Sequence, residues 1–272
     1  MNSASKTGGI DLTSLEKSWM NLEKCYEKVR RVDSNYRAGV VFTKRRFEEA
    51  SDPGERLYFQ AAGLLAVAYD HQQALQDMMR SAIHPFSVWS LIRPAFEAAF
   101  HVVWILDPDD SQERMRRGLR LAGDELRSRK ARDKAGKKVM GGQRNKDVQR
   151  RERRNQELGK KFEKEAQALH MGKNLIGKRV DPEKEFPKLE SLRIDKVDGN
   201  YFYLAWRILS ALQHGDMNAV AEVSDISKVI KIPGGWQTST TVNDDVLISM
   251  MQLSMLMQIT AIKLYIGRTT SN

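Results

Sequence analysis

The chain has little of what builds disulfide-bonded or many-turned folds. It contains one cysteine, 7 prolines and 18 glycines in 272 residues. A single thiol cannot close an intramolecular disulfide, and Cys25 has no second cysteine with which to share a zinc ion. We therefore expect a protein of a reducing compartment, the cytoplasm. The scarcity of glycine and proline argues against a β-sandwich and favours helices.

Two further absences concern targeting and membranes. The first residues, MNSASKTGG, are polar and lack the apolar stretch that a secretory signal carries. The most apolar run, 246–266, is long enough to cross a bilayer. However, Gln252, Gln258 and Lys263 interrupt it. We expect a buried core helix there rather than a membrane span, and no membrane partner.

Charge is unevenly distributed along the chain. The formal net charge is +10, yet the segment from Arg114 to Lys161 holds 19 Lys or Arg against 6 Asp or Glu. Such a segment attracts polyanions, RNA or DNA first, through phosphate neutralisation and counterion release. The alternative is a solvated arm that contacts nothing specific. The residues that we expect to bind nucleic acid are Arg144, Lys146, Arg150, Arg151, Arg153 and Arg154.

Helical periodicity dominates the pattern of apolar residues. A capping box, TSLE, begins the first helix, and SDPGE separates it from the second. β-branched residues alternate around Pro-Gly-Gly and predict a hairpin over 227–242. Because two short strands are not stable alone, we expect this hairpin to pack on the helices. The expected helices span about 13–49, 54–82, 86–106, 111 into the basic segment, 198–220 and 246–266.

These elements predict an all-α fold, a helical bundle with a long basic helical insertion and one small β-hairpin before the C-terminal helix. We expect residues 1–10 to form a flexible tail and residues 11–272 to form a single helical domain. Residues 114–165 would form the basic insertion or arm. Glycines within 134–146 interrupt its helical pattern. The arm is therefore either two helices with a hinge or a helical hairpin that stands off the body.

Several common catalytic motifs are missing. The chain has no phosphate-binding loop, no Gly-x-Ser-x-Gly elbow and no His-Glu-x-x-His helix. Its 5 histidines do not cluster with carboxylates at the spacing of metal ligands. We therefore expect neither a catalytic metal nor a cofactor.

The first constellation with chemical potential is RPAFEAAFH, 93–101. Arg93 and Glu97 are i,i+4 neighbours and can pair on one helical face, which His101 continues. The surrounding helix is strongly apolar, and charges on a buried helix are costly unless they are paired. Two interpretations stay open. The pair fixes helix packing, or it forms a pocket wall where Arg93 binds an anion and Glu97 orients it.

The second constellation is RILSALQHGD, 207–216. Tyr203, Arg207, Ser210 and His214 follow one another at offsets of four, three and four, so they share one face of a helix. A histidine on an apolar helix is usually a core residue with a satisfied hydrogen bond. Four polar side chains in line favour instead a helix that lines a binding site, with Tyr203 and Ser210 as binding residues.

The spacing of Arg207 and His214 resembles the Arg-x(4–6)-His motif of the HEPN superfamily. Its members are helical bundles, and many are metal-independent RNases of toxin or phage-defence systems that typically act as dimers. The resemblance implies that His214 exchanges a proton with a ribose 2′-OH while Arg207 holds the scissile phosphate. The two helices also resemble uncharacterised bacterial helical proteins, in which Arg93, Glu97 and His214 would share a pocket.

We therefore expect a HEPN-like RNA-binding protein, a candidate metal-independent endoribonuclease of bacterial defence or toxin type that forms a homodimer. The alternative is a non-enzymatic helical module that binds nucleic acid or an acidic protein. Exposure discriminates between the two. Burial of Arg207 and His214 away from any cleft favours the module, and a groove shared with Arg93 and Glu97 favours an active pocket.

Overall fold

The computed structural model describes residues 13–39, 44–81, 84–140, 146–194 and 197–270. The described part is mainly helical, which confirms the all-α bundle with one small hairpin. The expected tail, 1–10, lies outside it. The α-helices are α1 (Thr13–Arg37), α2 (Lys44–Glu49), α3 (Asp52–Ser81), α4 (Ser87–Leu106), α5 (Ser111–Met140), α6 (Lys146–Ala168), α7 (Pro182–Glu185), α8 (Gly199–Gln213), α9 (Met217–Glu222) and α10 (Asp244–Thr269). The strands are β1 (Ser224–Ile232) and β2 (Gly235–Val242).

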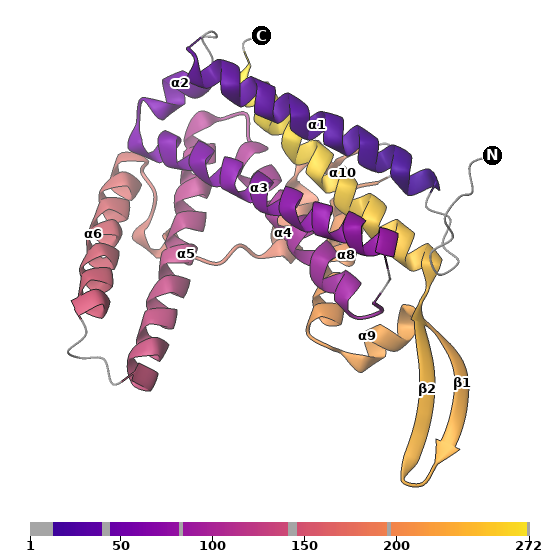
Figure 1. Cartoon of the computed structure of the whole chain (residues 1–272). Helices are drawn as coiled ribbons and strands as arrows, with labels where there is room; N and C mark the ends of the chain where they lie inside the picture. Colours follow the sequence, from indigo (N-terminus) through magenta and orange to yellow (C-terminus); the bar gives the residue numbers. More distant parts are fainter. Residues whose placement is uncertain (1–12, 40–43, 82–83, 141–145, 195–196, 271–272) are drawn as a thin grey trace.

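Helix α4 lies at the centre of the bundle, where it packs against α3, α10 and α8 (Figure 1). Its side chains are apolar on nearly all sides, and Trp89, Phe96 and Trp104 are at most 1% exposed. A helix with this pattern is stable only when neighbours cover its whole circumference. The central position of α4 places its buried cation, Arg93, at a helix–helix contact.

Helix α10 is the one described helix that is long and apolar enough to cross a membrane by length and composition, and half of its most apolar window is buried inside the protein. It packs against α4 and α1. Gln258, which interrupts the apolar run, accepts a hydrogen bond from Tyr26 at 2.9 Å and donates one to Gln72 at 3.0 Å. Gln258 therefore has partners within the bundle, whereas Gln252 and Lys263 lie on the exposed side of the helix.

Helices α5 and α6 form an antiparallel hairpin that stands off the bundle, called the arm below (Figure 1). Of the two forms expected for the basic segment, the structure has the helical hairpin. A small core of its own, which includes Leu119, Leu126, Phe162 and Leu169, lies between the two helices near the bundle. Farther along, Asn155 donates to Asp133 at 2.7 Å.

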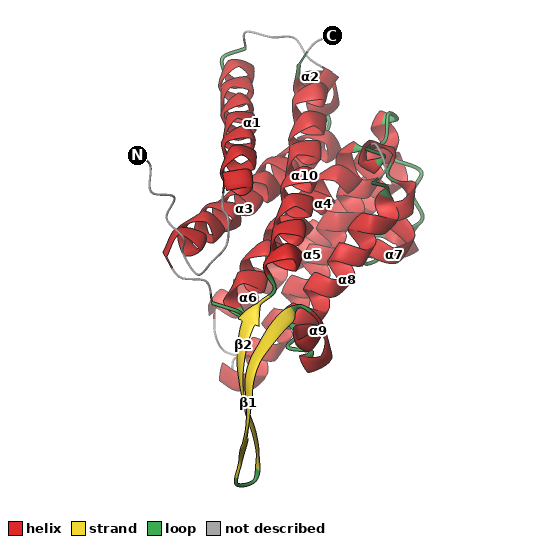
Figure 2. Cartoon of the chain, turned by 90° about the vertical axis from the view of Figure 1, so that its right-hand side faces the viewer, coloured by secondary structure: helices red, strands yellow, loops and turns green. Residues whose placement is uncertain are grey.

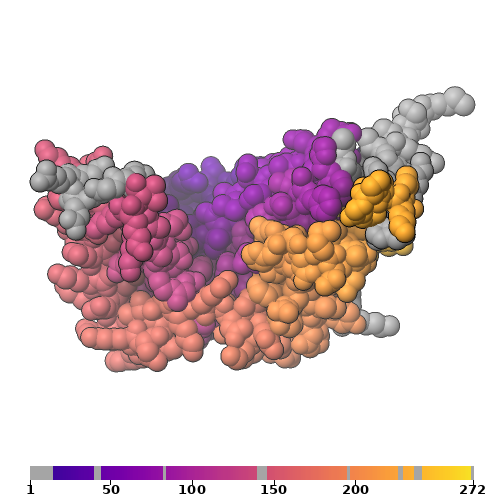
Figure 3. Space-filling model, turned by 90° about the horizontal axis from the view of Figure 1, so that it is seen from below, coloured from indigo at the N-terminus to yellow at the C-terminus, as the bar shows by residue number. Residues whose placement is uncertain are grey.

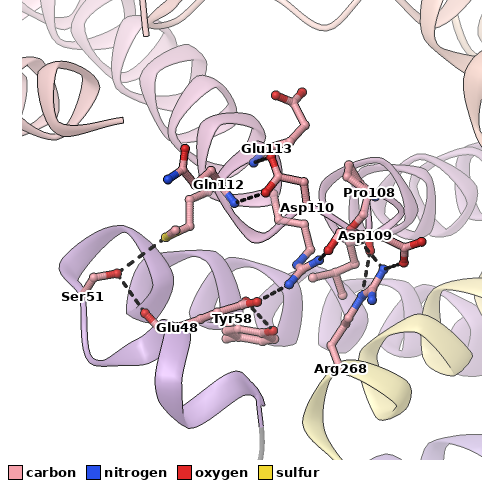
Figure 4. Close-up of polar contacts among 12 residues, drawn as sticks. Glu48, Ser51, Tyr58, Pro108, Asp109, Asp110, Gln112, Glu113 and Arg268 are labelled. Carbon is pink, nitrogen blue, oxygen red and sulfur yellow. Dashed lines mark hydrogen bonds and ion pairs between the residues drawn. The ribbon is translucent and has the colours of Figure 1, made fainter. Parts of the chain in front are cut away.

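The base of the arm is fixed to the bundle by Arg114, at the start of α5. Its guanidinium donates to the carbonyls of Pro108 at 2.6 Å and Asp109 at 2.8 Å, and it pairs with Glu48 of α2. Glu48 also accepts a hydrogen bond from Tyr58 at 2.8 Å. Figure 4 shows this junction, where Arg268 of α10 also reaches the carbonyl of Pro108.

Two helices expected to be continuous are interrupted, so these two predictions were wrong. The first, 13–49, is split into α1 and α2, and residues 40–43 between them lie outside the described part. The other, 198–220, is split into α8 and α9. Gly215 adopts φ +73°, which ends α8, and the Asp216 carboxylate caps α9 by accepting from the Asn218 N–H at 2.9 Å.

The β-hairpin projects away from the helices instead of packing on them, so this expectation was also wrong (Figures 1 and 2). Val229 is 58% exposed and Ile230 is 53% exposed. The strands pair antiparallel with a bulge, and Asn243, at the end of β2, donates its N–H to the Val223 carbonyl at 3.0 Å. The ladder between the strands and the hydrogen bond at its base hold the hairpin, and α9 packs against β1.

Candidate functional site

Arg93 joins α4 to α8. It is 6% exposed, and its Nη1 donates to Gln213 Oε1 at 2.6 Å. Its Nη2 lies 3.3 Å from Glu97 Oε2, so the expected i,i+4 pair is present. The guanidinium also lies 5.4 Å from the centre of the Trp206 ring. Burial of this cation is offset by an anion, an amide oxygen and an aromatic ring.

The residues of α8 that meet α4 each precede a residue of the expected polar stripe by one position. Trp206 and Gln213 contact Arg93, and Phe202 and Leu209 are buried in the core. Since each residue turns a helix by about 100°, the side chains one position further along point away from this contact. The shift places the stripe at the edge of the helix–helix contact.

The four residues of the stripe differ in exposure. Arg207 and His214 are exposed, Ser210 and Tyr203 are partly buried, and Tyr203 stacks on Trp206 with ring centres 6.3 Å apart. His214 is the C-cap of α8. Neither expected arrangement is therefore seen. Arg207 and His214 are not buried, and Arg93 reaches α8 at Gln213, the residue before His214.

A polar pocket of about 880 Å³ opens beside the junction of α4 and α8. It lies in the hollow that Figure 3 shows between the arm and the α8–α9 part of the body. Of the residues expected to bind, only Glu97 lines it. Its lining consists of Glu97 and His101 of α4, Asp124, Arg127 and Ser128 of α5, residues 178–182, and Trp206 of α8.

The loop that carries residues 178–182 is held tightly against α5. Arg120 donates from Nε to the Lys178 carbonyl and from Nη2 to the Arg179 carbonyl, both at 2.8 Å. Gly123 and Gly177 touch through their backbones, and a Cβ on Gly123 would lie 2.4 Å from the Gly177 nitrogen. Gly177 also adopts φ +73°, which favours glycine. The pocket rim is thus fixed by backbone contacts.

Each carboxylate in the lining has a cationic partner. Glu97 pairs with Arg93 as described, and Asp124 pairs with Arg127 one helical turn away. Asp181 lies 2.9 Å from Lys184 Nζ. These pairs leave the acidic side chains of the pocket electrically compensated.

His101 lies on the α4 wall of the pocket. Burial lowers its pKa below the usual 6.5, and the nearby Arg179 acts in the same direction. The carboxylates of Glu97 and Asp124 oppose the shift. The imidazole is therefore neutral at neutral pH and has one nitrogen that donates and one that accepts a hydrogen bond.

The basic residues expected to bind nucleic acid lie on α6, apart from Arg144, which falls outside the described residues. Lys146, Arg150, Arg153 and Arg154 are exposed, and none of them has an ion pair within the part of the chain that the structure describes. Arg151 is also exposed and lies 3.8 Å from Asp133. The free cations recur at i, i+4, i+7 and i+8, so they share one face, opposite the buried Val148, Asn155 and Phe162.

Sequence reasoning missed most of the pocket. His101 could be placed on the face of Arg93 and Glu97 from its spacing, but its neighbours come from α5 and an irregular loop. Lys178 and Arg179 carry no periodic signal, and the contact of Gly123 with Gly177 joins residues far apart in the chain. Only the tertiary structure brings these groups together.

Comparisons with protein-family models, with curated proteins and with solved structures found no match to this chain. Among the described residues, no group of three or more His, Cys, Asp or Glu side chains is arranged to hold a metal ion.

Proposed function

We propose that this chain is a HEPN-like RNA-binding protein that uses the arm to hold the RNA backbone. The observation that carries the proposal is the cationic face of α6, formed by Lys146, Arg150, Arg153 and Arg154, all exposed and without ion pairs among the described residues. At a rise of about 1.5 Å per residue these four span about 12 Å, enough to neutralise several successive phosphates. Cations held in one row and left unpaired favour a polyanion over a merely solvated surface.

The position of the arm supports the same function. Arg114 and its partners fix the base of the arm, so the cationic face is held at a defined place relative to the bundle. The opposite, buried side of α6 packs on α5, so the cationic face points away from α5 and is open to a strand from solvent. An acidic protein is the rival occupant, and competition by RNA against a polyglutamate peptide separates the two.

Binding of fluorescent single-stranded RNA tests the proposal at fixed salt. The variant in which Lys146, Arg150, Arg153 and Arg154 are all glutamine should bind at least tenfold more weakly. A matched control removes four exposed cations of α1, namely Lys17, Lys24, Lys28 and Arg31. Equal affinity of the two variants would contradict a role of the arm.

RNA cleavage is a second candidate function, favoured by the exposure of both Arg207 and His214 two turns apart on α8. In this proposal His214 takes the proton of a ribose 2′-OH while Arg207 stabilises the charge that develops on the phosphate. Attack of the 2′ oxygen on phosphorus breaks the bond to the 5′ oxygen, which takes up a proton from water and leaves as a 5′-hydroxyl, and a 2′,3′-cyclic phosphate remains.

Incubation of the protein with RNA in EDTA tests this chemistry. Products with 2′,3′-cyclic ends that His214→Ala abolishes and His84→Ala retains would support it. If no RNA is cleaved, the protein is a binding module. If His214→Ala cleaves as well as the parent protein, the catalytic role of His214 is contradicted. From the HEPN resemblance we further propose that the protein is a cytoplasmic homodimer that acts in defence or as a toxin. Sedimentation equilibrium tests whether it is a dimer.

A further inference from the structure

We propose that the pocket between α4, α5, α8 and residues 178–182 binds the phosphate group of a nucleotide-sized ligand. This site is separate from the cationic face of α6 and from Arg207 and His214. The inference goes beyond the proposed function, because binding of a single nucleotide needs neither the cationic face of α6 nor cleavage chemistry.

The charges that face the pocket argue for an anion. Its three carboxylates, Glu97, Asp124 and Asp181, each have a cationic partner already. Lys178 and Arg179 also line the pocket, and in the described part of the chain their side chains make no ion pair or hydrogen bond. The pocket and the partners of its acids therefore carry two surplus positive charges. A phosphate is the common biological ligand that two adjacent cations of this kind bind.

The two cations are held in place without using their charges. Arg120 binds the backbone carbonyls of Lys178 and Arg179, and the contact of Gly123 with Gly177 fixes the preceding turn. The loop is thus ordered before any ligand arrives, so binding does not have to supply the entropy of ordering it. Both side chains stay exposed and free to converge on a phosphate.

His101 adds a hydrogen-bonding group from the α4 wall of the pocket. Within the described residues its ring makes no hydrogen bond, and its only ring contact is with Phe100. A neutral imidazole can donate to a phosphate oxygen or accept from a sugar hydroxyl. The volume of about 880 Å³ falls in the range of small-molecule sites and holds a nucleotide.

Two sources offer this chemistry, a free nucleoside monophosphate and the terminal nucleotide of a phosphorylated RNA. Calorimetric titration of the full chain with adenosine 5′-monophosphate tests the first. Titration with an RNA hexamer that carries either a 5′-phosphate or a 5′-hydroxyl tests the second. Binding of the monophosphate identifies a nucleotide site, and preference for the phosphorylated hexamer alone identifies an RNA end.

Variants of Lys178 and Arg179 decide whether the phosphate ligand binds in the pocket. Arg179→Ala and Lys178→Ala keep the carbonyls that Arg120 holds, and each should weaken binding of the phosphate ligand at least tenfold. Arg193→Ala is the matched control, because Arg193 lies in the same stretch of chain and outside the pocket lining. Its one ion pair among the described residues is with Glu190. Unchanged thermal unfolding of the variants shows that the fold is intact.

The proposal is overturned if neither phosphate ligand binds at millimolar concentration, or if Arg179→Ala binds it as well as the parent protein. The variant with four glutamines on α6 separates this result from the proposed function. It should lose RNA affinity and keep binding of the monophosphate. Failure of the pocket would instead leave salt-dependent RNA binding intact.

Discussion

Arg93 on α4 donates a hydrogen bond to Gln213 on α8 at 2.6 Å, and this bond joins the central helix to the helix whose C-cap is His214. Replacement of Arg93 by alanine leaves Glu97 and Gln213 without their partner and removes the guanidinium from Trp206. We expect Arg93→Ala to lower the free energy of unfolding by about 3 kcal/mol. Urea unfolding measures the change, with the surface variant Arg193→Ala as a control that shifts it by less than about 0.5 kcal/mol. A loss as small as that of the control would show that the junction adds nothing to stability.

The contact of Gly123 with Gly177 should tolerate no side chain. A Cβ on Gly123 would lie 2.4 Å from a backbone nitrogen, so Gly123→Ala must push the loop off α5. We expect a loss of stability and faster amide exchange at residues 176–179. Gly136 lies on the same helix with nothing within 4 Å of an added Cβ. Gly136→Ala should therefore leave stability unchanged or raise it by up to about 1 kcal/mol. Equal effects of the two substitutions would contradict the tight contact.

The buried pair of Glu48 and Arg114 should show strong coupling. The exposed fractions of their side chains are 4% and 3%. Removal of one partner leaves the other charge buried and unpaired. Glu48→Leu and Arg114→Met should therefore each lower the free energy of unfolding by about 3–5 kcal/mol. The double variant should lose less than the sum of the two. Simple additivity in urea unfolding would mean that the two side chains do not interact.

His101 should make stability depend on pH. Since burial lowers its pKa below 6.5, the unfolded chain binds a proton near pH 6 that the folded chain does not. The resulting loss of unfolding free energy is absent above pH 6.5 and grows as the pH falls toward the lowered pKa. We expect the melting temperature of the parent protein to fall more steeply between pH 7 and pH 5 than that of His101→Asn. Parallel curves would show that the imidazole is not shielded from solvent.

The sequence supports the helical elements better than the site. Long amphipathic and apolar stretches determine α3, α4 and α10, because burial of their apolar faces dominates local preferences. The pair of Arg93 and Glu97 follows from helical spacing alone. The sequence analysis did not predict that the helix expected over 198–220 is divided into α8 and α9. Gly215 and Asp216 nevertheless carry the turn and cap signals that divide it.

The pocket was not predictable from the sequence, because its members meet only through tertiary contacts. Lys178 and Arg179 lie in an irregular loop, and their place depends on Arg120 and on two glycines that touch across the fold. The face of α8 that packs on α4 was not predictable from the sequence either. A helical stripe fixes which residues share a face, but packing against α4 decides which face turns inward.

A salt titration of RNA binding tests the role of the arm most directly. Each phosphate contact on single-stranded RNA adds about 0.7 to the negative slope of log affinity against log salt. If Lys146, Arg150, Arg153 and Arg154 each neutralise one phosphate, the variant with four glutamines should have a slope shallower by about 3 than the parent protein. The matched α1 variant should retain the parent slope. A parent slope near zero, or equal slopes for all three proteins, would contradict RNA binding by the arm.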